Sequence, residues 1–351
     1  MLRLSGRLTI ALDAMGGDQA PDIVVRGAGI ARERFPDVHF LLFGDEAEIR
    51  PLLDAVPRLR DACEIRHTAE RILADAKPSA ALRNGRGSSM WMAIEAVRSG
   101  DAAAIVSAGN TGALMAIAKF VLRMPRGVDR PAIASFFPTL RGESAMLDLG
   151  ANVECDAHNL VQFAVMGAIF ARSVLGIDRP TVGLLNVGAE EVKGNEAVRA
   201  AAATLRATPL PLRFEGFVEG NDIAAGTVDV VVTDGFTGNV ALKTAEGTAH
   251  LYAEFLREAF RSSPLASIGY LLARPTLRKL RERLDPRRYN GAVFLGLNGV
   301  AVKSHGGSDA FAFGNAIGVA VDMVRHGFLE GVRAELERMG DGPGPAQAAA
   351  G

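Results

Sequence analysis

The chain has 351 residues, of which 48% are hydrophobic, and its formal net charge is −1. This composition is typical of a folded chain with a substantial core, and the near-neutral charge gives no sign of a nucleic-acid partner. The longest stretch without a charged residue, 102–118, is shorter than the roughly 20 apolar residues of a membrane span, so no membrane crossing is expected.

The two cysteines, Cys63 and Cys155, form no zinc pattern, and the six histidines are scattered, so no metal is expected. Such sparse cysteine usage indicates a reducing compartment, although a single disulfide is compatible with the sequence. The Gly/Ala/Pro-rich segment 340–351 predicts a disordered tail, which leaves 1–339 as a single α/β domain.

Apolar, β-branched runs alternate with helix-length segments along the chain. Strands are predicted at 8–14, 39–45, 103–109, 132–138, 144–150, 181–188, 212–218 and 228–235. Helices are predicted at 20–34, 46–56, 88–99, 111–123, 156–174, 194–207 and 238–261. Several strands are apolar throughout, as in parallel strands covered on both faces. The alternation predicts a three-layer αβα fold with a doubly wound, mostly parallel sheet.

Two segments depart from this alternation. Segment 291–307 holds two short apolar runs around Asn298-Gly299, which predicts a β-hairpin, and a helix follows within 304–324. Segment 249–288 predicts a helical hairpin that is apolar after Pro264 and basic over 274–288. An apolar tip with a basic flank suits an anionic membrane or an acidic protein, and a dimer interface explains it equally well.

The predicted strand ends are polar. They are rich in Gly, Asn, Asp and Thr at 12–21, 106–112, 147–156, 184–196, 217–222 and 232–239. Loops between strands and helices use such residues for turns and caps anyway. Because ligands bind beyond the carboxyl ends of strands in doubly wound sheets, six such ends together predict a shared cleft.

Two of these strand-to-helix corners match each other. VSAGNTGALMAI (106–117) aligns without a gap with VTDGFTGNVALK (232–243). A helix N-terminus offers free N–H groups and a positive dipole, and small residues let an anion approach. Neither corner is a Walker loop or a dinucleotide fingerprint, so an anion cradle is expected and no cofactor.

No nucleophile–histidine–acid arrangement stands out in the sequence. His305 is flanked by glycines in KSHGG and is expected to line the site. Lys193 lies in EEVKGNE, where it pairs with Glu190 or Glu191 or holds phosphate. Cys155 is either a small buried residue or an activated thiol.

Seven motifs make the chain resemble a known family. In order, they are IALDAMGGDQAP, VSAGNTGALMA, LDLGANVECDAHNLVQFAVMG, LLNVGAEEVKGNE, FVEGNDI, VTDGFTGNVALK and GLNGVAVKSHGGSDAFAFGNAI, and they span residues 9–317. Together they are similar to the bacterial phosphate acyltransferases of the PlsX family.

This resemblance implies reversible transfer of a long-chain acyl group from acyl carrier protein to inorganic phosphate, as a step of phospholipid synthesis. It implies a homodimer in the cytoplasm, peripherally associated with the inner face of the membrane, where a membrane glycerol-3-phosphate acyltransferase takes the product. It further implies a fold similar to phosphotransacetylases and isocitrate/isopropylmalate dehydrogenases, with a helical hairpin inserted, and no metal or nucleotide cofactor.

The chemistry agrees with this implication. Phosphate is already an anion, and the leaving thiol has a pKa of roughly 8.5, so neither a strong base nor a strong acid is needed. The enzyme must hold phosphate beside the thioester and stabilise the oxyanion. By analogy with phosphotransacetylase, loop 107–112 is expected to bind phosphate, with corner 233–239 facing it.

The candidate residues fall into three groups. The catalytic candidates are Lys193, Asp234 and His305. The candidates for binding phosphate or thioester are Asp13, Gly16, Gly17, Ser107, Gly109, Asn110, Thr111, Gly112, Asn152, Asn186, Asn195, Thr233, Gly235, Thr237 and Asn239. The candidates for membrane or carrier-protein contact are Arg274, Arg278, Lys279, Arg281, Arg287 and Arg288.

Three other functions remain open at this point. The chain could be a phosphotransacetylase that uses coenzyme A and short acyl groups, or a dehydrogenase on a related scaffold. It could also be a regulator that binds lipid surfaces without catalysis. The apolar-tipped, basic hairpin favours carrier-protein-dependent acyl transfer over the first of these.

Overall fold

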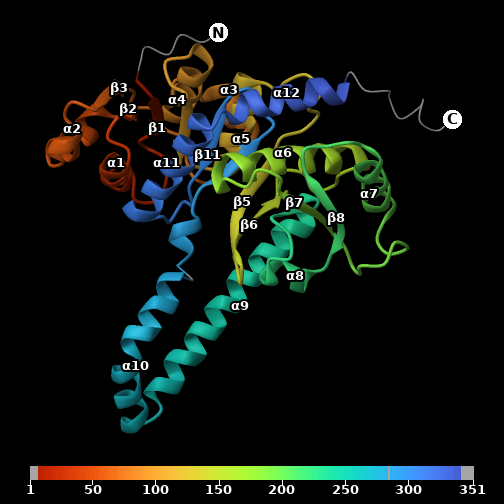
Figure 1. Cartoon of the computed structure of the whole chain (residues 1–351). Helices are drawn as coiled ribbons and strands as arrows, with labels where there is room; N and C mark the ends of the chain where they lie inside the picture. The colour runs from red at the N-terminus through yellow and green to blue at the C-terminus, as the bar shows by residue number, and fades with distance from the viewer. Residues whose placement is uncertain (1–6, 284, 341–351) are drawn as a thin grey trace.

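The computed structural model describes residues 7–283 and 285–340 (Figure 1). One sheet runs through the molecule, with eleven strands among the described residues. These strands are β1 (Thr9–Asp13), β2 (His39–Gly44), β3 (Cys63–His67), β4 (Ala104–Ser107), β5 (Ala132–Thr139), β6 (Gly142–Leu147), β7 (Thr181–Leu185), β8 (Arg213–Val218), β9 (Val230–Val232), β10 (Ala292–Leu295) and β11 (Val300–Lys303).

The sheet is mostly parallel, as predicted, but its two halves run in opposite directions. The strand order is β3-β2-β1-β4-β11-β10-β5-β6-β9-β7-β8. Seven neighbouring pairs are parallel, and only β11–β10, β10–β5 and β5–β6 are antiparallel. Strands β1–β4, β11 and β5 therefore point one way, whereas β10, β6, β9, β7 and β8 point the other way.

Helices cover both faces of the sheet. They are α1 (Asp22–Arg34), α2 (Glu46–Asp54), α3 (Pro78–Asn84), α4 (Ser89–Ser99), α5 (Thr111–Leu122), α6 (Ala157–Leu175), α7 (Glu196–Ala207), α8 (Gly220–Ala225), α9 (Gly235–Arg261), α10 (Pro264–Arg283), α11 (Ala310–Arg325) and α12 (Phe328–Gly340), with 3₁₀ turns η1 (Pro57–Leu59) and η2 (Pro286–Tyr289).

Burial along the strands shows the three layers. On β1, Ile10 and Leu12 face one core with α1, α6 and α11, whereas Ala11 faces a second core with α4 and α5. This alternation is the two-residue period of a strand. A third, smaller core lies on that second face under α8 and the start of α9.

Helix α6 is long and apolar enough to cross a membrane by length and composition. However, 78% of its apolar window is buried inside the fold. It packs against α7, α12 and β9, so it is a core helix.

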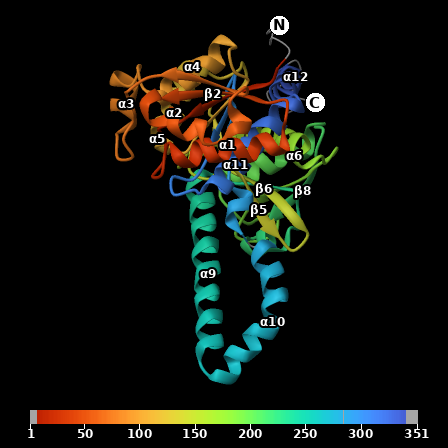
Figure 2. The same cartoon turned by 90° about the vertical axis from the view of Figure 1, so that its left-hand side faces the viewer.

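The predicted helical hairpin is present and leaves the body of the molecule. Helices α9 and α10 pack on each other and project together beyond the sheet (Figures 1 and 2). The predicted β-hairpin is also present as β10–β11. The predicted tail, 340–351, lies outside the described residues except for Gly340, the last residue of α12.

The sequence missed one strand and three helices. Strand β3 reads CEIRH and lies at the edge of the sheet, where polar side chains face solvent and no apolar run is needed. Helices α3 and α8 have only seven and six residues, too few to show a helical period. Two residues separate the end of α11 from the start of α12, and no helix is predicted from the sequence beyond residue 324.

Candidate active site

A buried carboxylate anchors the first corner. Asp13 ends β1 and is 1% exposed. Its two oxygens accept hydrogen bonds from Ser107 Oγ and Ser89 Oγ, each at 2.6 Å. Ser107 Oγ in turn accepts the N–H of Gly109 at 3.0 Å. Burial raises the pKa of Asp13, while these hydrogen bonds oppose the shift.

The glycines of this corner are required by close packing. A Cβ on Gly16 would lie 2.4 Å from Asp13 Oδ2 and 2.8 Å from the backbone N of Gly109. Gly17 has φ +111°, a conformation that favours glycine. The loops after β1 and β4 therefore pack backbone against backbone at Gly16 and Gly109.

Lys303 brings a positive charge to the same corner. It ends β11, is 9% exposed, and donates to Ala108 O at 3.2 Å and to Ser304 O. Burial lowers the pKa of its ammonium to about 8, and the carboxylates of Asp13 and Asp18 oppose this shift. A buried ammonium beside glycine-rich backbone suits an anion.

Helix α5 begins at this corner, and Asn110 caps it. Asn110 Oδ1 accepts the N–H of Ala113 at 2.9 Å, and its Nδ2 donates to Ala74 O at 2.6 Å and Ala76 O at 3.1 Å. An amide has only two N–H donors, so none is left for an anion in this conformation. The predicted donor role of the Asn110 side chain is therefore wrong, and its role is to shape the loop.

His305 lies at the edge of the corner and is exposed. Its ring Nδ1 accepts the backbone N–H of Gly307 at 3.2 Å. The backbone N–H of His305 donates to Asn290 Oδ1 at 3.0 Å. Asn290 also donates to Ser304 Oγ at 2.8 Å, which ties the end of the helical hairpin to this corner. We call this whole set, at the ends of β1, β4 and β11, the first cluster.

A second buried carboxylate organises the other corner. Asp148 is 0% exposed and accepts the N–H groups of Ile133, Gly150, Ala151 and Asn152 at 2.7–3.2 Å. The side-chain amide of Asn152 donates to it as well, at 2.8 Å. Asp148 thus folds the loop after β6, and burial raises its pKa against these hydrogen bonds.

The predicted residues of the second corner form hydrogen bonds with neighbouring parts of the chain. Asp234 caps α9 and accepts both the N–H and the hydroxyl of Thr237, at 2.8 and 3.0 Å. Asn239 donates to Leu149 O at 3.1 Å. A Cβ on Gly235 would lie 2.6 Å from Asn152 O. We call this set, at the ends of β6 and β9 and including Thr233, the second cluster.

Loop 186–195 follows β7 and lies beside the second cluster, because β7 pairs with β9 in parallel. Asn186 donates to Lys193 O at 3.2 Å, and Asn195 caps α7 through Val198 N–H at 2.9 Å. Lys193 is exposed. Glu191 pairs with Arg206 at 2.6 Å, so it is not the partner of Lys193.

The two clusters lie at the carboxyl ends of strands that point in opposite directions. Val106 of β4 and Val232 of β9 share one row of paired residues, through Val302, Val293, Ala134 and Leu147. Five strand spacings, about 24 Å measured along the sheet, separate these two residues. The directions differ because the three successive pairs β11–β10, β10–β5 and β5–β6 are antiparallel. The shared cleft and the facing of the two corners stay predictions.

Burial decides the role of the two cysteines. Cys63 and Cys155 are free thiols, and burial raises the pKa of each to about 12, so Cys155 is not an activated thiol. Among the described residues no group of acidic, histidine or cysteine side chains is arranged for a metal ion.

The predicted basic contact residues have different surroundings. Arg274, Arg278 and Arg288 are exposed, and the side chains of Lys279 and Arg281 lie outside the described ones. Arg287 instead pairs with Asp285 at 2.6 Å and with Asp309 at 2.8 Å. Arg287 is itself exposed and joins η2 to the start of α11, so its charge is shared with two carboxylates, and its contact role stays a prediction.

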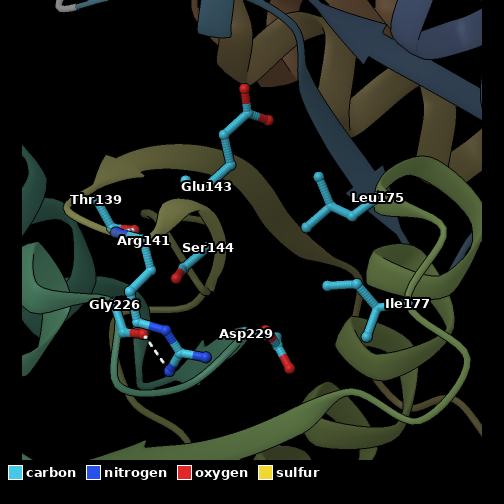
Figure 3. A pocket seen from close by; sticks show the side chains of 9 residues that line it. Thr139, Arg141, Glu143, Ser144, Leu175, Ile177, Gly226 and Asp229 are labelled. Carbon is cyan, nitrogen blue, oxygen red and sulfur yellow. Dashed lines mark hydrogen bonds between the residues drawn. The ribbon is translucent and has the colours of Figure 1, made fainter.

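A cavity of about 390 Å³ lies at the turn between β5 and β6 (Figure 3). It is lined by Thr139, Arg141, Gly142, Glu143, Ser144, Leu175, Ile177, Gly226 and Asp229. The guanidinium of Arg141 points toward Gly226 and donates to its carbonyl oxygen at 3.1 Å. No predicted site residue lines this cavity.

Sequence reasoning missed Ser89, Asp148 and Lys303. Lys303 is the first residue of KSHGG, so its position at a strand end was available as a signal. Ser89 and Asp148 look like ordinary helix-start and strand-end residues, and only the fold shows what they contact.

Comparison with known proteins identifies the family of this chain. The family model described as "Fatty acid synthesis protein" matches residues 8–331. A phosphate acyltransferase of Rhodospirillum centenum is 68% identical over 336 residues, covering 96% of this chain and 95% of that protein. One of Paramagnetospirillum magneticum is 62% identical over 349 residues, covering 99% of each.

Solved structures support the same fold. A phosphotransacetylase from Streptococcus pyogenes aligns with a TM-score of 0.61 at 18% identity, over 92% of this chain and 95% of that one. A putative 4-hydroxythreonine-4-phosphate dehydrogenase from Salmonella typhimurium aligns with a TM-score of 0.55 at 12% identity, over 91% and 100%. The predicted phosphotransacetylase-like α/β fold is confirmed, and with the family match over most of its length the chain belongs to the fatty acid synthesis proteins.

Proposed function

We propose that this protein is an acyltransferase that moves an acyl group from a thioester to inorganic phosphate. The observation that carries the proposal is the first cluster, where the Lys303 ammonium meets glycine-rich backbone and the N-terminus of α5. Relatives of 62–68% identity are named phosphate acyltransferases, which fits an anion site of this kind.

The reaction needs little acid–base assistance. A phosphate oxygen attacks the thioester carbonyl carbon, the C–S bond breaks, and the thiolate leaves and takes a proton. We place phosphate at the first cluster, where Lys303 balances its charge and the first N–H groups of α5 bind its oxygens. Asp13, Ser89 and Ser107 hold the backbone in place for this, and His305 borders the same site.

We infer that the donor is a long-chain acyl group on acyl carrier protein and that the product serves phospholipid synthesis. A coenzyme A donor is the alternative. The roles predicted for Lys193 and for the second cluster remain proposals.

The helical hairpin supports a proposal of dimerisation and peripheral membrane contact from the cytoplasm. On the hairpin, α9 exposes Leu251, Tyr252 and Phe255 by 50–70%, and α10 exposes Leu265 and Leu272 by about 80%. Exposed apolar surface of this extent marks an interaction site. We assign the α9 side of the hairpin to a second copy of the chain and the α10 side, with Arg274 and Arg278, to anionic lipid beside a membrane glycerol-3-phosphate acyltransferase.

The proposal is tested by thioester turnover with phosphate omitted or added. Purified protein is given palmitoyl-acyl carrier protein or acetyl-CoA, and thiol release is followed. We expect release only with phosphate and far faster with the carrier-protein donor. Efficient turnover of acetyl-CoA would instead support the phosphotransacetylase alternative, and release that ignores phosphate would contradict the proposal.

A further inference from the structure

One surface beside the first cluster carries an excess of positive charge. Two carboxylates border it: that of Glu70 lies beside Gly87, and Asp75 precedes Lys77 by two residues. The chain as a whole has 39 basic and 40 acidic residues, so its charges are balanced. Segments 76–94 and 102–128 contain no Asp or Glu. They contain six basic residues, all exposed: Lys77, Arg83, Arg86, Lys119, Arg123 and Arg126.

These two segments form one continuous surface. Helix α3 packs on α5, and a Cβ on Gly112 would lie 2.8 Å from Pro78. Arg86 lies over the ring of Trp91 at 6.0 Å, and that ring lies 5.9 Å from Phe120 of α5. We call this surface, defined by the six basic residues and Phe120, the α3–α5 face.

The charges of this face are available to a partner. Among the described residues, no ion pair joins any of the six to a carboxylate. Phe120 lies among them and is 58% exposed, so the face also offers one apolar anchor. Positive surface around an apolar anchor is suited to an acidic protein, whose charge steers it to the site.

The face leads directly to the first cluster. Helix α5 starts at the proposed phosphate loop, and Lys119 lies eight residues further, about 12 Å along the helix axis. Asn110 holds the loop that ends in Ala76, just before Lys77. A protein bound here would have its surface within reach of the loop through an extended prosthetic arm.

We propose that the α3–α5 face is where the acidic carrier protein docks to present its acyl thioester. This inference rests on the proposed function and adds the docking site to it. A lipid surface fits this face less well, because apolar side chains are few here and many on the hairpin tip. The two basic regions thus bind different partners: the α3–α5 face binds carrier protein and the hairpin binds lipid.

The test is charge reversal on this face, Lys119→Glu with Arg123→Glu. Binding of fluorescently labelled acyl carrier protein is measured by anisotropy, and turnover is measured with two donors, acyl carrier protein and the small neutral thioester acetyl-pantetheine. We expect at least tenfold weaker carrier-protein binding, a matching rise in its KM, and a smaller salt dependence. Turnover of acetyl-pantetheine should stay within twofold.

The matched control is Arg26→Glu with Arg58→Glu, which makes the same change in net charge on the opposite face of the sheet. It should leave carrier-protein binding unchanged. The milder pair Lys119→Gln with Arg123→Gln should show an intermediate loss, and thermal unfolding monitors the fold of all three variants.

Several results would overturn the inference. Carrier-protein binding unchanged in the reversed variant, or equally weakened in the control, would exclude the α3–α5 face while leaving acyl transfer intact. If the reversed variant loses binding to anionic phosphatidylglycerol vesicles but still binds carrier protein, the α3–α5 face is a lipid-binding surface. If the wild type binds no carrier protein and uses only coenzyme A donors, the proposed donor fails as well.

Discussion

The two matched corners share the motif V-[ST]-x-G-x-T-G but have different structures. In the first, β4 ends at Ser107 and the helix cap is Asn110, so two residues of loop intervene. In the second, β9 ends at Val232 and the cap is Asp234, so the helix begins two residues earlier in the alignment. The first corner has an open loop over a buried ammonium, whereas the second is closed around the Asp148 carboxylate.

The difference shows that the repeated motif specifies a strand-to-helix turn but does not specify what that turn binds. V-[ST]-x-G-x-T-G supplies small residues and helix-capping groups in both places. What separates the corners is the neighbouring strand, which brings Lys303 to the first and the Asp148 loop to the second. We therefore expect first-cluster changes to affect phosphate use and second-cluster changes to affect stability.

The largest expected effect is on stability at the second cluster. Asp148→Ala leaves four partly buried backbone N–H groups without their acceptor, and we expect a loss of about 3 kcal/mol in the free energy of unfolding. Urea unfolding followed by circular dichroism measures it. Asp148→Asn keeps one acceptor oxygen and should lose less, and a stable Ala variant would show that the loop does not depend on this carboxylate.

The next effect is on catalysis at the first cluster. Lys303→Met removes the buried charge and should lower kcat/KM for phosphate by about 10²- to 10³-fold. The free energy of unfolding of the Met variant should stay close to that of the wild type, because removing a desolvated ammonium also removes the cost of burying it. Lys303→Arg, which keeps the charge, should recover part of the activity. Full activity of the Met variant would remove Lys303 from the anion site.

The third effect is a pH dependence with opposite signs in activity and stability. The pKa of Lys303 is about 8, so phosphate use should fall about tenfold per pH unit above that value as the ammonium is lost. The unfolded-state pKa is about 10.4, and between these values the unfolded chain binds more protons. Stability should therefore rise with pH in this window. In Lys303→Arg both trends should disappear; a wild-type profile there would contradict the assignment.

The smallest expected effects are those of removing the side chains that cap α5 and α9. Asn110→Ala and Asp234→Ala should each cost about 1 kcal/mol of stability, as expected for loss of a cap. Asn110→Ala should also raise the KM for phosphate, because the loop it ties to residues 74–76 lies at the proposed anion site. Phosphate titrations of both variants measure this, and equal KM values would erase the functional distinction between the corners.

Much of the fold followed from the sequence because its signals are local. Eight strands, seven helices and both hairpins correspond to apolar runs and turn residues that can be read along the chain. The reversal of the sheet could not be read this way, since it depends on β10 and β5 pairing across about 160 residues of sequence. The first cluster was predicted except for Ser89 and Lys303, whose contacts depend on that long-range packing.

The placement of phosphate at the first cluster is tested by a crystal structure of the wild-type protein soaked in arsenate, whose anomalous scattering marks the anion. We predict an arsenate peak at the amino end of α5, beside Gly109, Thr111 and the Lys303 side chain. A peak at the amino end of α9 or in loop 186–195, with none at α5, would contradict the account.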